Sequence, residues 1–344
     1  MKVGIVYDPV HSKHDPGAHV EISDRLEKVI SSLKQTRLLS RLTPIASRPA
    51  TIRELSRVHF PEHIQFIQSI ASKGGGAIDP DTILSSGSFE AALYAAGGTI
   101  RAMEEVLDGS VDYAFALVRP PGHHATPHQA MGFCLFNNVS IAASHALSRY
   151  GLERLAIIDF DVHHGNGTQE VFYYNPQVLY VSVHQDPLFP GTGHIEETGF
   201  GQAAGTKVNI PLPPGCGDAE YQTAFEKIVI PVVERFQPQL ILVSAGFDLH
   251  WADDISSMYL STTGIVNLVK ILKTLADRVC QNRLAIVLEG GYHQTALTNS
   301  IKATFEMLLD NDFSPDLLGP SPHAVIPPLI IPLIQYIRKI HSLA

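Results

Sequence analysis

Short apolar segments alternate with helical patterns along most of this 344-residue chain. The apolar segments are rich in β-branched residues and have the length of buried strands. We expect strands at 3–8, 113–120, 154–161, 178–183, 240–246 and 284–291, and helices at 23–38, 51–72, 88–107, 137–150, 219–236 and 262–281. This alternation is typical of a parallel sheet covered by helices on both faces. It therefore predicts an α/β fold.

The domain organisation is expected to be simple, because no repeat or low-complexity tract divides the chain. The Gly/Ser/Pro-rich segment 74–88 is predicted to be a surface loop, since the alternation resumes after it without a change in composition. Beyond residue 312 a proline-rich stretch predicts an extended arm that leads into a short apolar helix at 329–340. We expect a catalytic domain over 1–312 and an arm over 313–344. The arm is expected to pack either on the domain or on a partner subunit, and the second arrangement would make the protein a homo-oligomer.

Composition and charge exclude several functional classes. Hydrophobic residues make up 45% of the chain and charged residues 17%, which excludes global disorder and fits a large core. The net charge of −9 offers no basic face for nucleic acid. Cys134, Cys216 and Cys280 are too few for a disulfide framework, and no run of 18 apolar residues predicts a membrane span. We therefore expect a cytoplasmic enzyme that contacts neither nucleic acid nor membranes.

Polar residues collect where the predicted strands end. Tyr292 follows the last strand, and four other strands are followed by RPPGHHA (119–125), DVHHGNGT (161–168), HQDPLFPGTG (184–193) and FDLH (247–250). In open α/β sheets, ligands bind beyond the carboxyl ends of the strands. The sequence therefore predicts one functional site at this edge of the sheet.

The segment IDFDVHHGNG contains a candidate metal-ligand pattern. Alternate side chains of an extended strand share a face, so Asp159, Asp161 and His163 are expected to project together. Asp248, at the end of another predicted strand, would supply a third ligand beside Asp161 and His163. Three protein ligands with an open position are the pattern of catalytic zinc, and Fe(II) accepts the same ligands. The alternative is a buried polar cluster or a capping turn, in which the carboxylates would need other donors.

Two further motifs supply candidate proton-transfer and hydrogen-bonding groups. His123 and His124 are adjacent, so their rings point in different directions and predict two different roles. Tyr292 follows two glycines, and its hydroxyl would donate to an oxyanion opposite the metal. Phe133 and Phe189 would form the walls of a narrow slot. Each feature also has a structural interpretation, as a histidine pair bonded to backbone or as aromatic residues of the core.

Six motifs, in a fixed order, resemble those of the zinc-dependent histone deacetylase family, in particular its class II-like bacterial members and the acetylpolyamine amidohydrolases. The resemblance extends over roughly residues 3–310. The motifs are RPPGHHA (119–125), GFCLFNN (132–138), IDFDVHHGNGTQ (158–169), FPGTG (189–193), SAGFD (244–248) and EGGY (289–292). The resemblance implies a single-domain, three-layer, arginase-like fold with a mostly parallel sheet of about eight strands. It also implies hydrolysis that removes acetyl or other short acyl groups from acyl-lysine side chains or related acylated amines.

The resemblance implies roles in catalysis for eight residues. The zinc ligands would be Asp161, His163 and Asp248. The other roles would belong to His124 as general base and then acid, His123 as an electrostatic helper oriented by Asp159, Asn166 as the partner of the second histidine, and Tyr292 as the group that polarises the acyl carbonyl.

The resemblance also implies a substrate channel and an internal acetate pocket. Their residues would be Gly132, Phe133 and Phe189 along the channel, Ile255 at its mouth and Arg25 in the acetate pocket. Polyamine-selective relatives carry an acidic gatekeeper at the position of Ile255, so this apolar residue disfavours a polyamine substrate. The chain departs from the family at HVEISDR, where Val20 and Ser23 replace two prolines near the substrate mouth.

Structural potassium ions are a further implication of the resemblance. The first ion would lie near the zinc, with several backbone carbonyls among its ligands, at Asp159, Asp161, His163, Ser182 and Val183. A second ion would lie near Phe172, Asn175 and Val178.

Three other functions stay open on the sequence. An acetylpolyamine deacetylase would use the same chemistry. A binuclear manganese ureohydrolase shares the implied fold but needs more bridging carboxylates, and His164 and Gly165 stand where another Asp would be required. A non-catalytic acyl-lysine binding protein is expected to have lost a metal ligand or the tyrosine, whereas this chain has them all.

Overall fold

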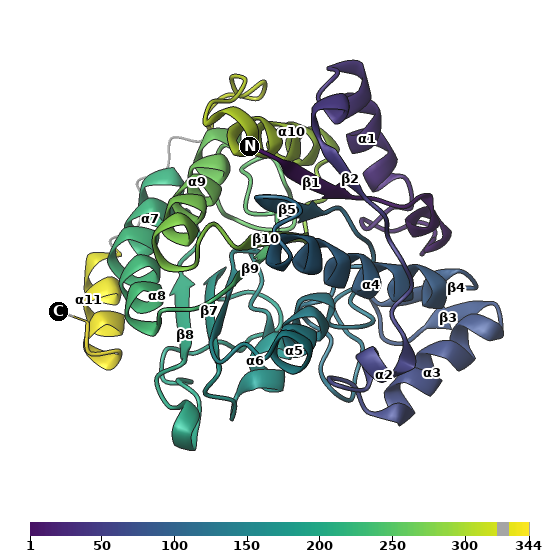
Figure 1. Cartoon of the computed structure of the whole chain (residues 1–344), viewed down its shortest axis with the longest axis horizontal. Helices are drawn as coiled ribbons and strands as arrows, with labels where there is room; N and C mark the ends of the chain where they lie inside the picture. The colour runs from purple at the N-terminus through teal and green to yellow at the C-terminus, as the bar shows by residue number, and fades with distance from the viewer. Residues whose placement is uncertain (322–329, 344) are drawn as a thin grey trace.

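The computed structural model describes residues 1–321 and 330–343, and an eight-stranded parallel sheet runs through its centre (Figure 1). The strand order is β2-β1-β5-β10-β9-β6-β7-β8. The strands are β1 (Val3–Val6), β2 (Thr43–Ile45), β5 (Tyr113–Ala116), β6 (Leu155–Asp159), β7 (Val178–Gln185), β8 (Lys207–Leu212), β9 (Ile241–Ala245) and β10 (Leu284–Leu288). Every neighbouring pair in this sheet is parallel, which confirms the predicted α/β class and sheet.

Helices cover both faces of the sheet and form one three-layer domain (Figure 1). The helices are α1 (Arg25–Gln35), α2 (Ile52–Leu55), α3 (Pro61–Ser72), α4 (Ser88–Leu107), α5 (Asn138–Tyr150), α6 (Asn166–Phe172), α7 (Asp218–Ala224), α8 (Ile230–Phe236), α9 (Thr262–Val279), α10 (Gln294–Asp310) and α11 (Ile331–Ile340). Alternate strand residues enter opposite cores: Tyr113 and Phe115 pack with α1, α9 and α10, and Ala114 and Ala116 pack with α4 and α5.

Two predictions about individual elements were wrong. The expected helix over 51–72 is two helices, because Phe60 precedes Pro61 and adopts an extended conformation that a helix interior excludes. The segment 74–88, expected to be a plain surface loop, contains an antiparallel hairpin of β3 (Gly75–Ala77) and β4 (Ile83–Ser85). Leu84 of this hairpin is buried in the core, so the hairpin is fixed to the domain.

The chain after α10 returns to the domain surface. Ile334 and Ile337 of α11 are buried against the π-helical turn Phe225–Val229, and the Arg338 guanidinium donates to the Lys227 carbonyl over 2.9 Å. Residues 322–329 of the expected arm lie outside the described residues, and the division of the chain at residue 312 stays a prediction. Within the described residues, no helix has the length and apolar character that crossing a membrane requires.

Candidate active site

The parallel strands place their carboxyl ends at one edge of the sheet, and the loops that follow β6 and β9 meet there. Asp161 and His163 follow β6, and Asp248 follows β9. His163 Nδ1 lies 3.0 Å from Asp161 Oδ1 and 3.5 Å from Asp248 Oδ2. One ligand atom from each residue lies within 4.8 Å of the other two, and all three side chains are buried. The structure therefore brings the predicted metal ligands together.

The charges of this cluster fit a bound cation. Asp248 Oδ2 is buried and has no hydrogen-bond partner within the described residues. Burial and the neighbouring Asp161 raise the pKa of Asp248 to about 6. Burial lowers the pKa of His163, but the Asp161 and Asp248 carboxylates outweigh it and raise that pKa to about 9. Two buried carboxylates around one imidazole are costly without a positive ion, and a divalent metal among the three groups would remove this cost.

Gly290 allows the two carboxylates to approach each other. A Cβ atom at this position would lie 2.0 Å from Asp248 Oδ2 and 2.6 Å from Asp161 Oδ2. The Gly290 N–H donates to Asp161 Oδ2 over 2.8 Å and fixes the orientation of that carboxylate. The first position of the GG pair after β10 therefore admits no side chain.

The adjacent histidines have different partners, as predicted. His123 Nδ1 donates to Asp159 Oδ2 over 3.0 Å, and His124 Nδ1 donates to Asn166 Oδ1 over 2.8 Å. Burial lowers the pKa of His123, but Asp159 and Asp161 outweigh it and raise that pKa to about 10. Burial, together with the positive charges of His123 and His163, holds the pKa of His124 well below its usual value. A neutral His124 that donates through Nδ1 carries its lone pair on Nε2, where it can accept a proton.

Glu289 holds the histidine loop in place, and the sequence analysis gave it no role. Its Oε2 accepts the backbone N–H groups of Gly122 (2.7 Å) and His123 (3.2 Å), and its Oε1 accepts from Ser244 Oγ (3.0 Å). Burial raises the pKa of Glu289 to about 7, although His123 opposes the shift. The sequence feature that points to this role is the position of Glu289 at the end of a predicted strand, where it begins the motif EGGY.

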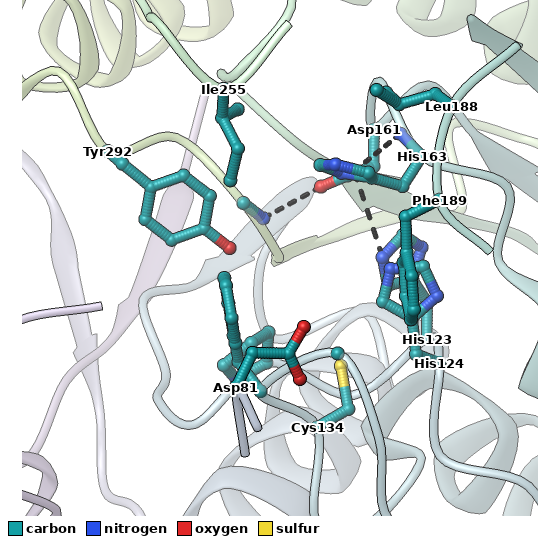
Figure 2. A pocket seen from close by; sticks show the side chains of 14 residues that line it. Asp81, His123, His124, Cys134, Asp161, His163, Leu188, Phe189, Ile255 and Tyr292 are labelled. Carbon is teal, nitrogen blue, oxygen red and sulfur yellow. Dashed lines mark hydrogen bonds and ion pairs between the residues drawn. The ribbon is translucent and has the colours of Figure 1, made fainter. Parts of the chain in front are cut away.

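A pocket of about 210 Å³ leads from the surface to these groups (Figure 2). Gly132, Phe133, Phe189, Ile255 and Tyr292 all line it, together with the two histidines. The Phe189 ring lies edge-on to His124 at 5.1 Å between centroids, and Phe133 lies edge-on to Tyr292 at 5.6 Å. A Cβ atom at Gly132 would lie 2.5 Å from the His124 ring, so the backbone itself forms this part of the wall. The predicted channel residues are therefore assembled around one pocket.

Tyr292 faces the histidine pair across this pocket, with its hydroxyl directed inward (Figure 2). The backbone N–H groups of Tyr292 and His293 both donate to Asp253 Oδ2, over 2.5 and 2.8 Å. The Arg25 guanidinium lies 4.8 Å from the Tyr292 ring and donates to the carbonyls of Gly291 and Glu289. Arg25 is buried and orients the tyrosine loop, while its predicted role in an acetate pocket stays a prediction.

Asp81 is a lining residue that sequence reasoning missed. It lies in the turn between β3 and β4, and it reaches the pocket from the hairpin (Figure 2). Burial and the neighbouring Asp79 raise the pKa of Asp81. A second hollow of about 510 Å³, lined by Val20 and Asp254 among others, shares Ile255 and Tyr292 with the pocket. The mouth therefore combines apolar and acidic side chains.

The residues of the predicted potassium sites fall into two places. Asp159 of β6 and Ser182 of β7 are partners in the strand register, beside the metal cluster. Asn175 lies in the turn between α6 and β7, and Val178 is the first residue of β7; the carbonyl oxygens of both accept hydrogen bonds from Lys207 Nζ. Lys207 was not predicted to take part in any site.

The fold and the site together define the class of protein: an α/β protein with a candidate single-metal centre at the carboxyl edge of a parallel sheet. The family model described as "Histone deacetylase domain" matches residues 19–308. The chain therefore belongs to the histone deacetylase family, whose members are deacetylases and related amidohydrolases.

Individual relatives agree with this assignment. The chain is 43% identical over 295 residues to a "Probable deacetylase" of Archaeoglobus fulgidus, covering 85% of this chain and 82% of the relative. It is 40% identical to a "Histone deacetylase-like amidohydrolase" of Pseudomonas aeruginosa, covering 80% and 73%. The crystal structure of the HDA15 HD domain matches with a TM-score of 0.89 and 33% identity, covering 99% of this chain and 96% of that one.

Proposed function

We propose that this protein is a zinc-dependent deacetylase that hydrolyses the amide bond of acyl-lysine side chains. One observation carries the proposal: the Asp161–His163–Asp248 cluster, the neutral His124 and the inward Tyr292 hydroxyl all border one pocket. A zinc ion held by the cluster would polarise the acyl carbonyl and lower the pKa of a water molecule. Fe(II) fits the same ligands.

The proton transfers follow from the arrangement of the histidines. His124 Nε2 takes a proton from the attacking water, while Asn166 holds the opposite side of the ring. The positively charged His123, paired with Asp159, adds a fixed charge beside the developing oxyanion. His124 then gives its proton to the leaving amine, and the acyl group leaves as a carboxylate.

Tyr292 completes the site from the opposite wall of the pocket. Burial raises its pKa well above the usual value, so its hydroxyl keeps its proton at neutral pH. That hydroxyl donates to the carbonyl oxygen of the substrate as this oxygen becomes negative. The proposal therefore assigns the tyrosine a role in the transition state.

The substrate preference is argued from the channel and its mouth. Phe133 and Phe189 offer apolar surface to the aliphatic stem of an acylated lysine, and Ile255 adds an apolar contact at the mouth. Acetylated polyamines are a second candidate substrate class, because Asp81 and Asp254 place carboxylates near the mouth. We favour acyl-lysine, since the two hollows share Tyr292 and the apolar Ile255 at their boundary, and neither residue is acidic.

A turnover panel tests the proposal. Purified zinc-loaded protein is assayed on acetyl-lysine peptides, longer acyl-lysine peptides and acetylpolyamines, with the His124→Ala variant as the inactive control. We expect turnover of acyl-lysine peptides, and a shift toward acetylpolyamines in Ile255→Glu. Preferential turnover of acetylpolyamines by the unaltered protein would contradict the substrate assignment. Absence of turnover on the whole panel, with zinc bound, would favour a non-catalytic acyl-lysine binding protein.

A further inference from the structure

Lys207 is a completely buried lysine at the start of the edge strand β8, outside the catalytic pocket. It pairs in register with Tyr180 of β7, whose hydroxyl donates to Asp159. Lysine is rarely buried without a paired carboxylate, because removing its charge from water is costly. Its environment therefore requires an explanation.

Four oxygen atoms surround the Lys207 ammonium group. Its Nζ lies 2.8 Å from the Val178 carbonyl oxygen and 2.7 Å from Thr206 Oγ1, and 3.4 Å from the carbonyl oxygens of Asn175 and Thr206. Within residues 1–321 and 330–343, no carboxylate forms an ion pair with it. Three backbone carbonyls and a hydroxyl form the kind of neutral oxygen cage that binds a potassium ion.

The protonation of Lys207 depends on two opposing effects. Burial lowers its pKa to about 7, because no carboxylate lies beside it. The surrounding oxygens act in the opposite direction: each presents lone pairs, and the protonated group has three N–H donors to offer them. The charged form is therefore the form that satisfies the cage.

We propose that the Lys207 ammonium group is a built-in cation that takes the place of the second structural potassium ion implied by the family resemblance. That ion was expected near Phe172, Asn175 and Val178. The carbonyls of Asn175 and Val178 already contact Lys207, and the Phe172 carbonyl accepts the Asn175 N–H over 2.9 Å. A further cation here would lie against a like charge in a buried site.

A built-in cation at Lys207 would stabilise the connection between α6 and β7, near the active site. The turn that carries Asn175 connects α6, which begins with Asn166, to β7, which begins with Val178 and carries Ser182. A covalently tethered ammonium group fixes this turn at any salt composition, whereas a bound potassium ion would fix it only when potassium is present. The chain is therefore expected to bind at most one structural potassium ion.

Variants that remove the ammonium group test this proposal through thermal unfolding at pH 6.5. Each protein is melted in potassium chloride and in choline chloride of equal ionic strength. Lys207→Ala removes the stem and opens the cage, so in choline we expect its midpoint to fall by on the order of 5 °C. Potassium, rubidium or ammonium ions are expected to restore much of this loss. Lys207→Met is expected to lose the same stability without recovery, because its side chain still fills the space.

Lys273→Ala is the matched control. Lys273 is also buried, but its ammonium group lies near the Asp277 carboxylate and over the Tyr113 ring. Its loss is expected to lower the midpoint with no more response to potassium than the unaltered protein shows. The same potassium response in Lys207→Ala as in the unaltered protein would overturn the proposal.

A second measurement needs no variant. Crystals of the unaltered protein grown with thallium(I), which substitutes for potassium and scatters anomalously, show directly where monovalent ions bind. We expect no thallium within the oxygen cage around Lys207. An anomalous peak in contact with the Asn175 and Val178 carbonyls would refute the inference, even if the Lys207 variants failed to fold.

Discussion

Asp159, Asp161, Asp248 and Glu289 bring four buried carboxyl groups to the site, and these outnumber the two histidines whose pKa values are raised, His123 and His163. Asp161 Oδ2 accepts the Gly290 N–H, while Asp248 Oδ2 has no hydrogen-bond partner within the described residues and lies 3.5 Å from His163 Nδ1. A cation held by Asp161, His163 and Asp248, as the proposed function requires, would balance this charge at the residue scale.

Tyr292→Phe tests the proposed oxyanion donor. The substitution removes one hydroxyl and keeps the ring that packs against Phe133 and Arg25. We expect kcat to fall about 100- to 1,000-fold, because one transition-state hydrogen bond is lost, while binding of a hydroxamate inhibitor changes little. Steady-state kinetics and inhibitor titration measure the two effects. A near-normal kcat would show that the hydroxyl does not stabilise the transition state.

Gly290→Ala tests the geometry of the metal ligands. The added Cβ would come within 2.0 Å of Asp248 Oδ2, so one carboxylate must move away from the cluster. We expect zinc affinity to fall by about 10-fold or more while the circular dichroism spectrum is retained, since displaced ligands bind zinc poorly. Competition with a zinc chelator measures the affinity. Unchanged zinc binding would contradict the assignment of these carboxylates.

At the scale of elements, the sequence predicted helices with a clear apolar periodicity and strands formed by apolar runs, and it missed elements without these patterns. The central strands were predicted because nearly all of their residues are apolar. The edge strand β8 was missed because its sequence, KVNIPL, contains Lys207, Asn209 and a proline. Helix α10 was missed because Ser300 and Thr304 lie buried on its packed face and weaken the apolar stripe.

The same reasoning explains what was predictable in the site. The rule that parallel strands end at one edge placed the metal ligands, the histidines and Tyr292 near one another. It gave no information on Asp81, because the hairpin that carries it does not belong to the central sheet. The rule gave no information on Lys207 either, because its cage is formed by backbone carbonyl oxygens together with the Thr206 hydroxyl, and backbone oxygens leave no pattern in the sequence.

Helix α11 provides a prediction about the stability of an element. Ile337 is completely buried against the core, whereas the neighbouring Tyr336 is 46% exposed. We expect Ile337→Ala to lower the free energy of unfolding by about 2–4 kcal/mol, because a buried side chain is truncated. Tyr336→Ala, the control, is expected to change it by less than about 1 kcal/mol. Denaturant unfolding compares them, and equal effects would show that α11 is not held by this face.

At the scale of the whole molecule, burial lowers the pKa values of several histidines besides His124, and five of them are lowered to about 3 or 4. These are His59 and His184, with pKa values of about 3, and His11, His250 and His341, with pKa values of about 4. In the unfolded chain each would titrate near 6.5. Between these values the unfolded state binds more protons than the folded state, so stability is lost as the pH falls.

We therefore expect the melting temperature to fall steeply between pH 6.5 and pH 4. Each histidine adds up to about 1.4 kcal/mol of destabilisation per pH unit within its window. Replacing one of them, as in His341→Gln, is expected to reduce the slope of stability against pH by about one proton. Calorimetry across this range measures the slope. A flat profile would show that these histidines are not neutral in the folded protein.

The dependence of turnover on one metal ion per chain tests the central claim most directly. The protein is stripped with a chelator, reconstituted stepwise with zinc, and assayed on an acetyl-lysine peptide at each step. We predict that activity is absent without metal, rises linearly and saturates at one zinc per chain. Asp248→Asn is predicted to need far more zinc for the same activity. Full turnover by the metal-free protein, or saturation only at two ions per chain, would contradict a single-metal centre formed by Asp161, His163 and Asp248.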